Sequence, residues 1–194
     1  HTSPYVRKVA VLLHETGLVD RVRFETVDGW AEPAHLTGDN PLSMVPTLVL
    51  DDGTSLYDSP VICEYLDGLH SGPRMIPDDD SRWPVLRDQA LADGIIDCAI
   101  LVMMEEVKRP EALRWDWWLD LKRRAIVRAL DQLEQRAPTL AQRLDLGVVA
   151  IACALAYLDL RGGVGEWRDR RPGLAQWFAA FAARASMLAT APPP

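Results

Sequence analysis

Cysteine is scarce in this chain, and no part of it stays apolar for long. Its three cysteines, Cys63, Cys98 and Cys153, are isolated, odd in number and set within apolar helical patterns. They form no disulfide framework, so we expect plain core residues in a reduced, cytoplasmic protein. The longest apolar stretch, residues 148–158, is shorter than the roughly 20 residues that a membrane span needs. A secretory signal would show as a basic segment followed by an apolar one, and none is visible, so we expect no secretory signal.

Positive charge is also in short supply. Lysine and arginine total 21 against 28 acidic residues, which gives a net charge of −7. The overall field repels nucleic acid and anionic membranes, so we expect neither as a partner. His14, His35 and His70 have no matching cluster of ligands, so no metal site is expected. The hydrophobic residues suffice for a packed core, because they make up 48% of the 194 residues and seven of them are tryptophan.

Two serine–proline pairs predict the helices of the first part of the chain. Serine is a good N-cap and proline suits the first helical position, so Ser3-Pro4 and Ser59-Pro60 each open a helix. Apolar residues then recur at helical spacing in both segments, and Gly17 ends the first helix.

The segment between these helices has β character. Residues 22–27 alternate as a strand, and residues 29–40 are predicted to form a loop with one short helical turn. Residues 47–50 and 55–57 are two short β-runs joined through an Asp-Gly pair, which favours a hairpin.

A linker divides the chain. Residues 71–80 are rich in glycine, proline and aspartate, so we predict one domain over residues 1–70 and an all-helical domain over residues 81–194. Helices are expected in the second domain at 83–108, 115–137, 146–160 and 173–188. Helix, strand, hairpin and helix followed by a helical bundle is a specific order of elements.

The two serine–proline helix starts could bind anions as well as cap helices. A helix N-terminus presents free N–H groups and a partial positive charge. Ser3 could donate its hydroxyl hydrogen to a thiolate, and Ser59 could bind a carboxylate. For an arbitrary helix start, capping alone is the commoner role.

Two neighbouring features favour a ligand over simple capping. The loop proline of Val45-Pro46 can be cis, which would hold the Val45 backbone open to pair with an extended peptide, although trans is far commoner for such bonds in general. Asp58 could bind an ammonium group, whereas an isolated acid of this kind is usually only solvated.

Together these segments resemble the glutathione transferase family. Residues 3–9 are similar to the first helix of its serine-type bacterial and plant members, and residues 40–48 look like its cis-proline loop. Residues 58–66 look like its acidic-serine segment, and residues 151–161 resemble the buried helix of its C-terminal domain. The resemblance covers nearly the whole chain. It implies an α/β thioredoxin-like N-terminal domain, with a small mixed sheet and flanking helices, and an all-α helical-bundle C-terminal domain.

The resemblance also implies a role for each candidate residue. Ser3 is the catalytic residue that stabilises the thiolate of glutathione. The backbone of Val45, beside Pro46, pairs with the cysteinyl amide. Asp58 binds the γ-glutamyl amine, and Ser59 binds the carboxylate next to it. Glutathione is then the co-substrate, no metal is needed, a small hydrophobic electrophile is the second substrate, and the protein is a homodimer.

The activity implied is that of a glutathione S-transferase in detoxification, and alternatives remain. An isomerase, dehalogenase or peroxidase can share the fold. So can a binding or regulatory protein with little catalytic activity, which Met44 suggests, because many relatives carry lysine there and methionine cannot pair with the glycyl carboxylate. His35 or Trp30 could hold that carboxylate instead. A thioredoxin-type redox protein is set aside, since no cysteine lies near Ser3.

Two further features depart from the family pattern. The family begins with a strand that leads into the serine, whereas only His1 and Thr2 precede Ser3, so either residues precede His1 or the sheet has one strand fewer. Asp145 is expected to cap the helix at 146–160, but Val148 cannot return a hydrogen bond as a capping box requires.

The electrophile pocket is expected between the two domains, at the start of the first helix and the helices after the linker. Trp115, Trp117 and Trp118 either line this pocket or are core and interface aromatics. The second alternative is favoured, because tryptophan is chiefly a packing residue.

Overall fold

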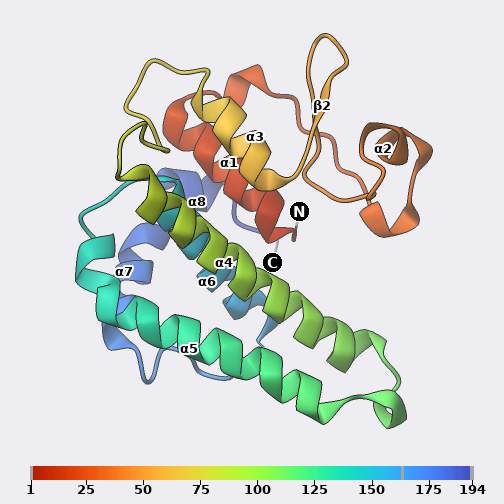
Figure 1. Cartoon of the computed structure of the whole chain (residues 1–194), viewed down its shortest axis with the longest axis vertical. Coiled ribbons are helices and arrows are strands. Elements are labelled where there is room, and N and C mark those ends of the chain that lie inside the picture. The colour runs from red at the N-terminus through yellow and green to blue at the C-terminus, as the bar shows by residue number, and fades with distance from the viewer. Residues whose placement is uncertain (1, 163, 193–194) are drawn as a thin grey trace.

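The computed structural model describes residues 2–162 and 164–192 and is mostly helical (Figure 1). The helices and strands in chain order are α1 Pro4–Thr16, α2 Ala34–Asp39, β1 Leu48–Val49, β2 Ser55–Leu56, α3 Ser59–Asp67, α4 Arg82–Met103, α5 Asp116–Leu140, α6 Leu146–Arg161, α7 Pro172–Ala182 and α8 Ala185–Ala189. Short 3-10 turns form at η1 Val19–Arg21, η2 Gly29–Ala31 and η4 Glu111–Leu113, and a π-helical turn, η3 Met104–Lys108, extends α4.

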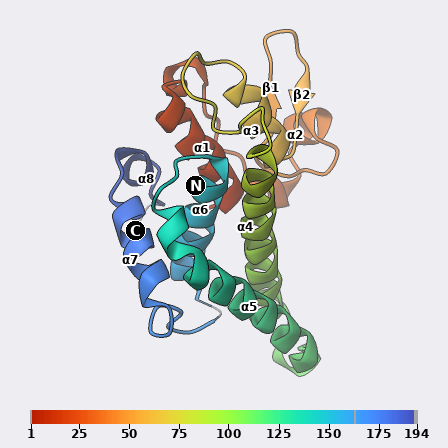
Figure 2. The same ribbon diagram turned by 60° about the vertical axis from the view of Figure 1, so that its left-hand side comes forward.

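Helix α6 forms the centre of the molecule. Every residue from Leu146 to Leu155 is buried, and α4 packs along this helix while α1 packs on it from the other part of the chain. Helices α5 and α7 complete the bundle, and α1 and α3 lie together above it (Figures 1 and 2). One apolar core therefore runs through both parts of the chain. The predicted fold class, a small α/β part followed by a helical bundle, is confirmed.

The starts of α1 and α6 form as their sequences predict. Helix α3 also begins at Ser59-Pro60, but Ser59 is its first helical residue and not its cap, because the N-cap position is Asp58 and no side chain among the described residues caps the helix. Ser3 is the N-cap of α1, and its Oγ accepts the N–H of Val6 at 3.4 Å, while Gly17 ends the helix at φ 71°. Asp145 caps α6 by accepting the N–H of Val148 at 3.1 Å.

The predicted strand at residues 22–27 is wrong. Within the described ranges the sheet consists of β1 and β2 alone, paired antiparallel, so it is not a mixed sheet. An extended segment becomes a strand only when a neighbour completes its hydrogen bonds. Residues 22–27 instead border a hollow of about 780 Å³ that separates them from residues 45–52. The alternating sequence has no strand edge within reach, so it stays extended and unpaired.

The single helix predicted over residues 173–188 is also wrong, since α7 and α8 are separate. Arg184 interrupts the helical pattern with extended backbone angles (φ −64°, ψ 145°). Its Nε and Nη2 each donate to the Glu15 carboxylate of α1 at 2.8 Å, and Ser186 Oγ donates to the same carboxylate at 2.5 Å. The turn lets both side chains reach α1, which the local sequence does not reveal.

The segment after α3 is held by one buried carboxylate. Asp67, fully buried, accepts the N–H groups of Met75 at 2.7 Å and Ile76 at 3.0 Å, and it pairs with His70 and Arg74. The carbonyl of Met75 in turn accepts the N–H of Leu146 at 2.9 Å. The predicted linker is therefore tied both to α3 and to the start of α6.

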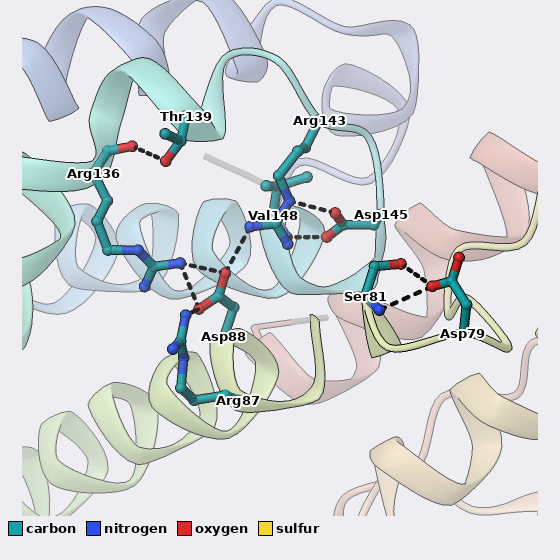
Figure 3. A network of polar contacts seen from close by, with 9 residues as sticks. All are labelled: Asp79, Ser81, Arg87, Asp88, Arg136, Thr139, Arg143, Asp145 and Val148. Atoms are coloured by element: carbon teal, nitrogen blue, oxygen red, sulfur yellow. Dashed lines mark hydrogen bonds and ion pairs between the residues drawn. The ribbon is translucent and has the colours of Figure 1, made fainter. Parts of the chain in front are cut away.

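A second buried carboxylate joins α4, α5 and the start of α6 (Figure 3). Asp88 is fully buried and receives hydrogen bonds from Arg136, at 2.7 and 2.6 Å, and from Arg143, at 2.9 Å. Arg143 also donates to the capping residue Asp145 at 2.7 Å. Gly147 makes this close packing possible, because a Cβ there would meet Asp88 Cβ at 2.9 Å. The arginines thus reinforce a helix start that lacks a reciprocal capping box.

Candidate functional site

Ser3 has an unused hydroxyl hydrogen. Among the described residues, its Oγ takes part in one hydrogen bond, as the acceptor from Val6. The side chain is half-buried, and Pro4 follows as the first residue of α1. The hydroxyl can therefore cap α1 and at the same time donate to an anion placed before the helix, where the helix dipole adds a favourable term.

Tyr5 is the other hydroxyl at this end of α1, and it already has a partner. Its OH donates to the carboxylate of Asp97 on α4. Burial, and then the hydrogen bond and the charge of Asp97, raise the pKa of Tyr5 above its ordinary value. The phenol stays protonated and committed to Asp97. This contact also brings the middle of α4 to the first turn of α1.

A buried ion pair lies one turn further along α1. Lys8 is fully buried, and its Nζ lies 2.7 Å from each carboxylate oxygen of Asp93 on α4. Burial raises the pKa of Asp93, Lys8 opposes this rise, and the nearby carboxylates of Asp97 and Asp58 add to it. Three carboxylates therefore share one region at the junction of α1, α3 and α4. Their combined field favours a cation such as an ammonium group there.

These contacts were not predicted. The available signal was Asp93 and Asp97, four residues apart on one face of α4, and Lys8 among the apolar residues of α1. Charged residues in such positions are usually paired. The sequence did not indicate which partner each would take.

Val45 offers an unpaired stretch of backbone. Its bond to Pro46 is cis, as the resemblance implied, and neither its N–H nor its carbonyl has a hydrogen-bond partner among the described residues. The loop is held by buried Asn40, whose Nδ2 donates to the Met44 carbonyl and to Thr47 Oγ1, each at 3.1 Å. The donor and acceptor of Val45 are therefore fixed in position and open to an extended peptide.

Asp58 and Ser59 stand at the start of α3. Ser59 is 2% exposed, yet neither its hydroxyl nor its N–H has a hydrogen-bond partner among the described residues. Asp58 is exposed, and its carboxylate is not engaged in capping the helix. In Figure 1, α3 and α1 begin at the same end of their packed pair, so Ser59 and Ser3 lie on one side of the molecule. Its N–H is one of the free donors at the start of a helix, and its hydroxyl also has a hydrogen to donate, so both groups could bind an anion.

The other residues singled out in the sequence are the tryptophans at the start of α5 and the three cysteines. Trp115 and Trp117 are 59% and 55% exposed and stack on each other, with ring centroids 5.1 Å apart, so they are not core residues. Cys63 and Cys153 are fully buried, as expected, and burial raises the pKa of each to about 12. Cys98 is only half-buried.

Two features are missing from the part of the chain that the structure describes. It contains no group of histidine, cysteine, aspartate or glutamate side chains that could hold a metal ion. None of its helices combines the length and apolar character needed to cross a membrane.

Comparison with known proteins gives a consistent result. The family model "Glutathione S-transferase, N-terminal domain" matches residues 2–69, and "Glutathione S-transferase, C-terminal domain" matches residues 117–180. The "Uncharacterized GST-like protein YibF" of Escherichia coli K12 is 35% identical over 201 residues, which cover 100% of this chain and 96% of that protein.

Solved structures agree with these matches. A glutathione transferase family member from Pseudomonas fluorescens Pf-5, crystallised with bound glutathione, is 47% identical with a TM-score of 0.95, covering 100% of this chain and 96% of that one. A glutathione S-transferase from Methylobacillus flagellatus KT with glutathione bound is 36% identical with a TM-score of 0.89, covering 99% and 96%. With both family domains matched and similarity along its whole length, the chain belongs to the glutathione S-transferase family.

Proposed function

We propose that this protein is an enzyme that binds glutathione and activates its thiol as a thiolate for attack on small hydrophobic electrophiles. The observation that carries the proposal is the pair of serine hydroxyls, at Ser3 and Ser59, that have hydrogen-bonding capacity to spare at the starts of two packed helices. Bound glutathione in the relatives from Pseudomonas and Methylobacillus supports the same ligand.

The γ-glutamyl and cysteinyl parts of the peptide would match these polar groups. Its γ-glutamyl carboxylate would receive the hydroxyl and N–H of Ser59, and its amine would meet Asp58 near Asp93 and Asp97. The cysteinyl N–H and carbonyl would pair with the Val45 backbone next to Pro46. The sulfur would then accept the hydroxyl hydrogen of Ser3.

Ser3 is sufficient for the proposed activation. A free thiol has a pKa of about 8.5, and lowering that pKa by about two units requires about 2.7 kcal/mol of preference for the thiolate. A hydrogen bond to a charged group contributes about 1.5–3 kcal/mol, and a helix N-terminus adds about 0.3–1 kcal/mol. No general base or metal is required for the step. The thiolate attacks the electrophilic atom and forms the S–C bond, and holding the two reactants together supplies further acceleration.

The electrophile would approach from the α4 side. The bond between Tyr5 and Asp97 joins the first turn of α1 to α4, and Leu101, one turn beyond Asp97, is 39% exposed. An exposed apolar side chain here would favour a hydrophobic electrophile, and apolar contacts discriminate weakly between related ones. Conjugation is therefore tested alongside hydroperoxide reduction, dehalogenation and isomerisation. Glutathione binding without turnover in any of these assays would instead support a binding or regulatory role.

Replacing Asp58 by asparagine is expected to weaken glutathione binding about tenfold, a loss of about 1.4 kcal/mol, because the γ-glutamyl amine loses an ionic partner. Isothermal titration of the full chain measures this change. Asp51→Asn is the matched control, since Asp51 is an equally exposed acid in the hairpin turn and has no part in the proposed site. Equal effects of the two substitutions would rule out a specific role for Asp58.

We further propose a homodimer. Val61 and Tyr65 are 45% and 38% exposed and share one face of α3, and Trp83 at the start of α4 is 67% exposed. The Glu64–Arg82 ion pair, at 2.5 Å, joins these two surfaces. An apolar area of this kind is typical of a subunit contact. Sedimentation at micromolar concentration should give twice 21.6 kDa, and Trp83→Glu should shift the mass towards 21.6 kDa. A wild-type chain that sediments as a monomer contradicts the proposal.

The broader assignments rest on the same site. Glutathione as co-substrate and three free cysteines support a cytoplasmic enzyme of detoxification. We also divide the chain into a glutathione-binding domain at residues 1–70, a linker at 71–80 and a helical domain at 81–194. The composition of residues 71–80 supports that boundary, and Asp67 and Leu146 hold the linker in place through Met75.

A further inference from the structure

The part of the proposed site that would face the glycine residue of glutathione is unusually acidic. Residues 24–58 supply the cis-proline loop, α2 and the hairpin, and they contain neither lysine nor arginine. The same segment carries seven carboxylates, at Glu25, Asp28, Glu32, Asp39, Asp51, Asp52 and Asp58. The part of the fold that would surround the peptide is therefore strongly acidic.

The direction of the peptide identifies which residues its glycine end would meet. If Asp58 and Ser59 hold the γ-glutamyl end and Val45 pairs with the cysteinyl residue, the glycine extends past Val45 on the side away from α3. Met44 directly precedes Val45 and is 63% exposed. Its carbonyl is fixed by hydrogen bonds from Asn40 Nδ2, at 3.1 Å, and Thr47 Oγ1, at 2.9 Å. The side chain at position 44 therefore leaves a fixed backbone beside the glycine end.

The next side chains on this surface are also uncharged or acidic. Ser43 Oγ donates to the Gly29 carbonyl at 3.0 Å, which fixes the loop against η2. Trp30 in η2 is 76% exposed and lies between Asp28 and Glu32 in sequence. Its indole N–H is a neutral donor.

Two cations lie just before residues 24–58 in the chain, Arg21 and Arg23, and both border the hollow that residues 45–52 also line. Arg21 donates to the Leu69 carbonyl at 3.3 Å, beyond the end of α3. The basic residues around the α4–α5 connection are well separated from α2 in both views (Figures 1 and 2), and Arg109 and Arg114 bond to the Glu105 carboxylate and the Glu106 carbonyl. A carboxylate at the glycine end thus lies against a segment, residues 24–58, that carries seven acidic side chains and no lysine or arginine.

We propose that this site does not recognise a charged glycine carboxylate, and that it accepts glutathione derivatives blocked there as an amide or ester at least as well as glutathione. This specificity rests on the proposed glutathione binding at Val45 and Ser59. Met44 is its determinant, because it occupies the position from which a cation could reach the carboxylate. The substrate class then includes thiol peptides whose glycine end is neutral.

Isothermal titration of the full chain with glutathione and with its C-terminal amide tests the proposal. The wild type should bind the amide with a dissociation constant equal to or below that of glutathione. Met44→Lys should tighten glutathione binding about fivefold at low salt, the effect of one opposite charge at about 4 Å in water, and should leave amide binding unchanged. Added salt should reduce this gain, because it screens exposed charges. Met44→Gln is the neutral control and should change neither constant by more than about twofold.

The titrations distinguish a failure of this inference from a failure of the proposed function. If wild-type protein binds glutathione at least fivefold more tightly than the amide, a group that recognises the carboxylate exists and the inference is overturned while the proposed function stands. Trp30→Phe and His35→Ala would then identify that group by abolishing the difference. If neither thiol binds, the proposed function fails, and the inference fails with it.

Discussion

Replacing Ser3 by alanine should lower the rate of glutathione conjugation on the order of 50-fold at about pH 6, because a thiol with a pKa near 8.5 is almost wholly protonated there. The difference in rate between the variant and the wild type should shrink as pH rises past about 8.5, since the thiolate then forms without the hydrogen bond from Ser3. The measurement is kcat/KM across pH with glutathione and an activated aryl halide. Glutathione affinity should change little, because Asp58, Ser59 and Val45 are retained.

Different substitutions at Ser3 distinguish the effect of losing its hydroxyl at the site from the effect of losing the N-cap of α1. Alanine also removes the N-cap of α1, which costs about 1 kcal/mol, whereas glycine replaces a capping serine at a cost of only a few tenths. Ser3→Gly should therefore lose activity with nearly unchanged stability, and Ser3→Thr should retain much of it. Tyr5→Phe tests the neighbouring hydroxyl and should leave the thiol activated, since that phenol donates to Asp97. Turnover that survives Ser3→Ala at low pH would exclude Ser3 as the activating residue.

The largest effect on stability is expected at Asp88. Asp88→Asn should lower the free energy of unfolding by about 3 kcal/mol, because it leaves Arg136 and Arg143 without their shared carboxylate between α4, α5 and α6. Denaturant unfolding measures the loss. Asp159→Asn is the matched control, as its ion pair with Arg168 is partly exposed and should contribute about 1 kcal/mol or less. Similar losses of unfolding free energy for both variants would mean that the buried network stabilises the protein no more than a partly exposed ion pair does.

The same carboxylate predicts an acid sensitivity. Burial alone would raise the pKa of Asp88, but the hydrogen bonds and charges of Arg136 and Arg143 outweigh it and hold that pKa below its ordinary value. As pH falls, the unfolded chain therefore takes up this proton first. The stabilisation is complete above the unfolded pKa of about 3.9 and is lost as pH falls through the lower folded pKa. Asp88→Asn should remove this part of the acid-induced loss.

The sequence predicted features whose causes are local. The start of α1 follows from the capping serine Ser3, both α1 and α3 have a proline in the first helical turn, and the hairpin follows from an Asp-Gly turn. The serines and the acid that form the candidate site lie at these starts or next to them. For that reason the site could be proposed before its geometry was known.

Features that depend on distant partners were not predicted. Residues 22–27 have a strand-like pattern, but no strand lies within reach to pair with them. The break between α7 and α8 depends on Glu15, which is 169 residues from Arg184. The contact between Tyr5 and Asp97 joins residues 92 apart. Helical and strand periodicity record which face of an element is apolar, not which residue from elsewhere will meet it.

The central claim is that Ser3 stabilises the thiolate of bound glutathione. The most direct test is a pH titration of the thiolate's ultraviolet absorbance in the protein–glutathione complex. The account predicts an apparent thiol pKa of about 6.5 for the wild type, two units below the free value, and a return to about 8.5 in Ser3→Ala. A wild-type complex whose thiol titrates near 8.5, or a lowered pKa that persists in Ser3→Ala, would contradict it.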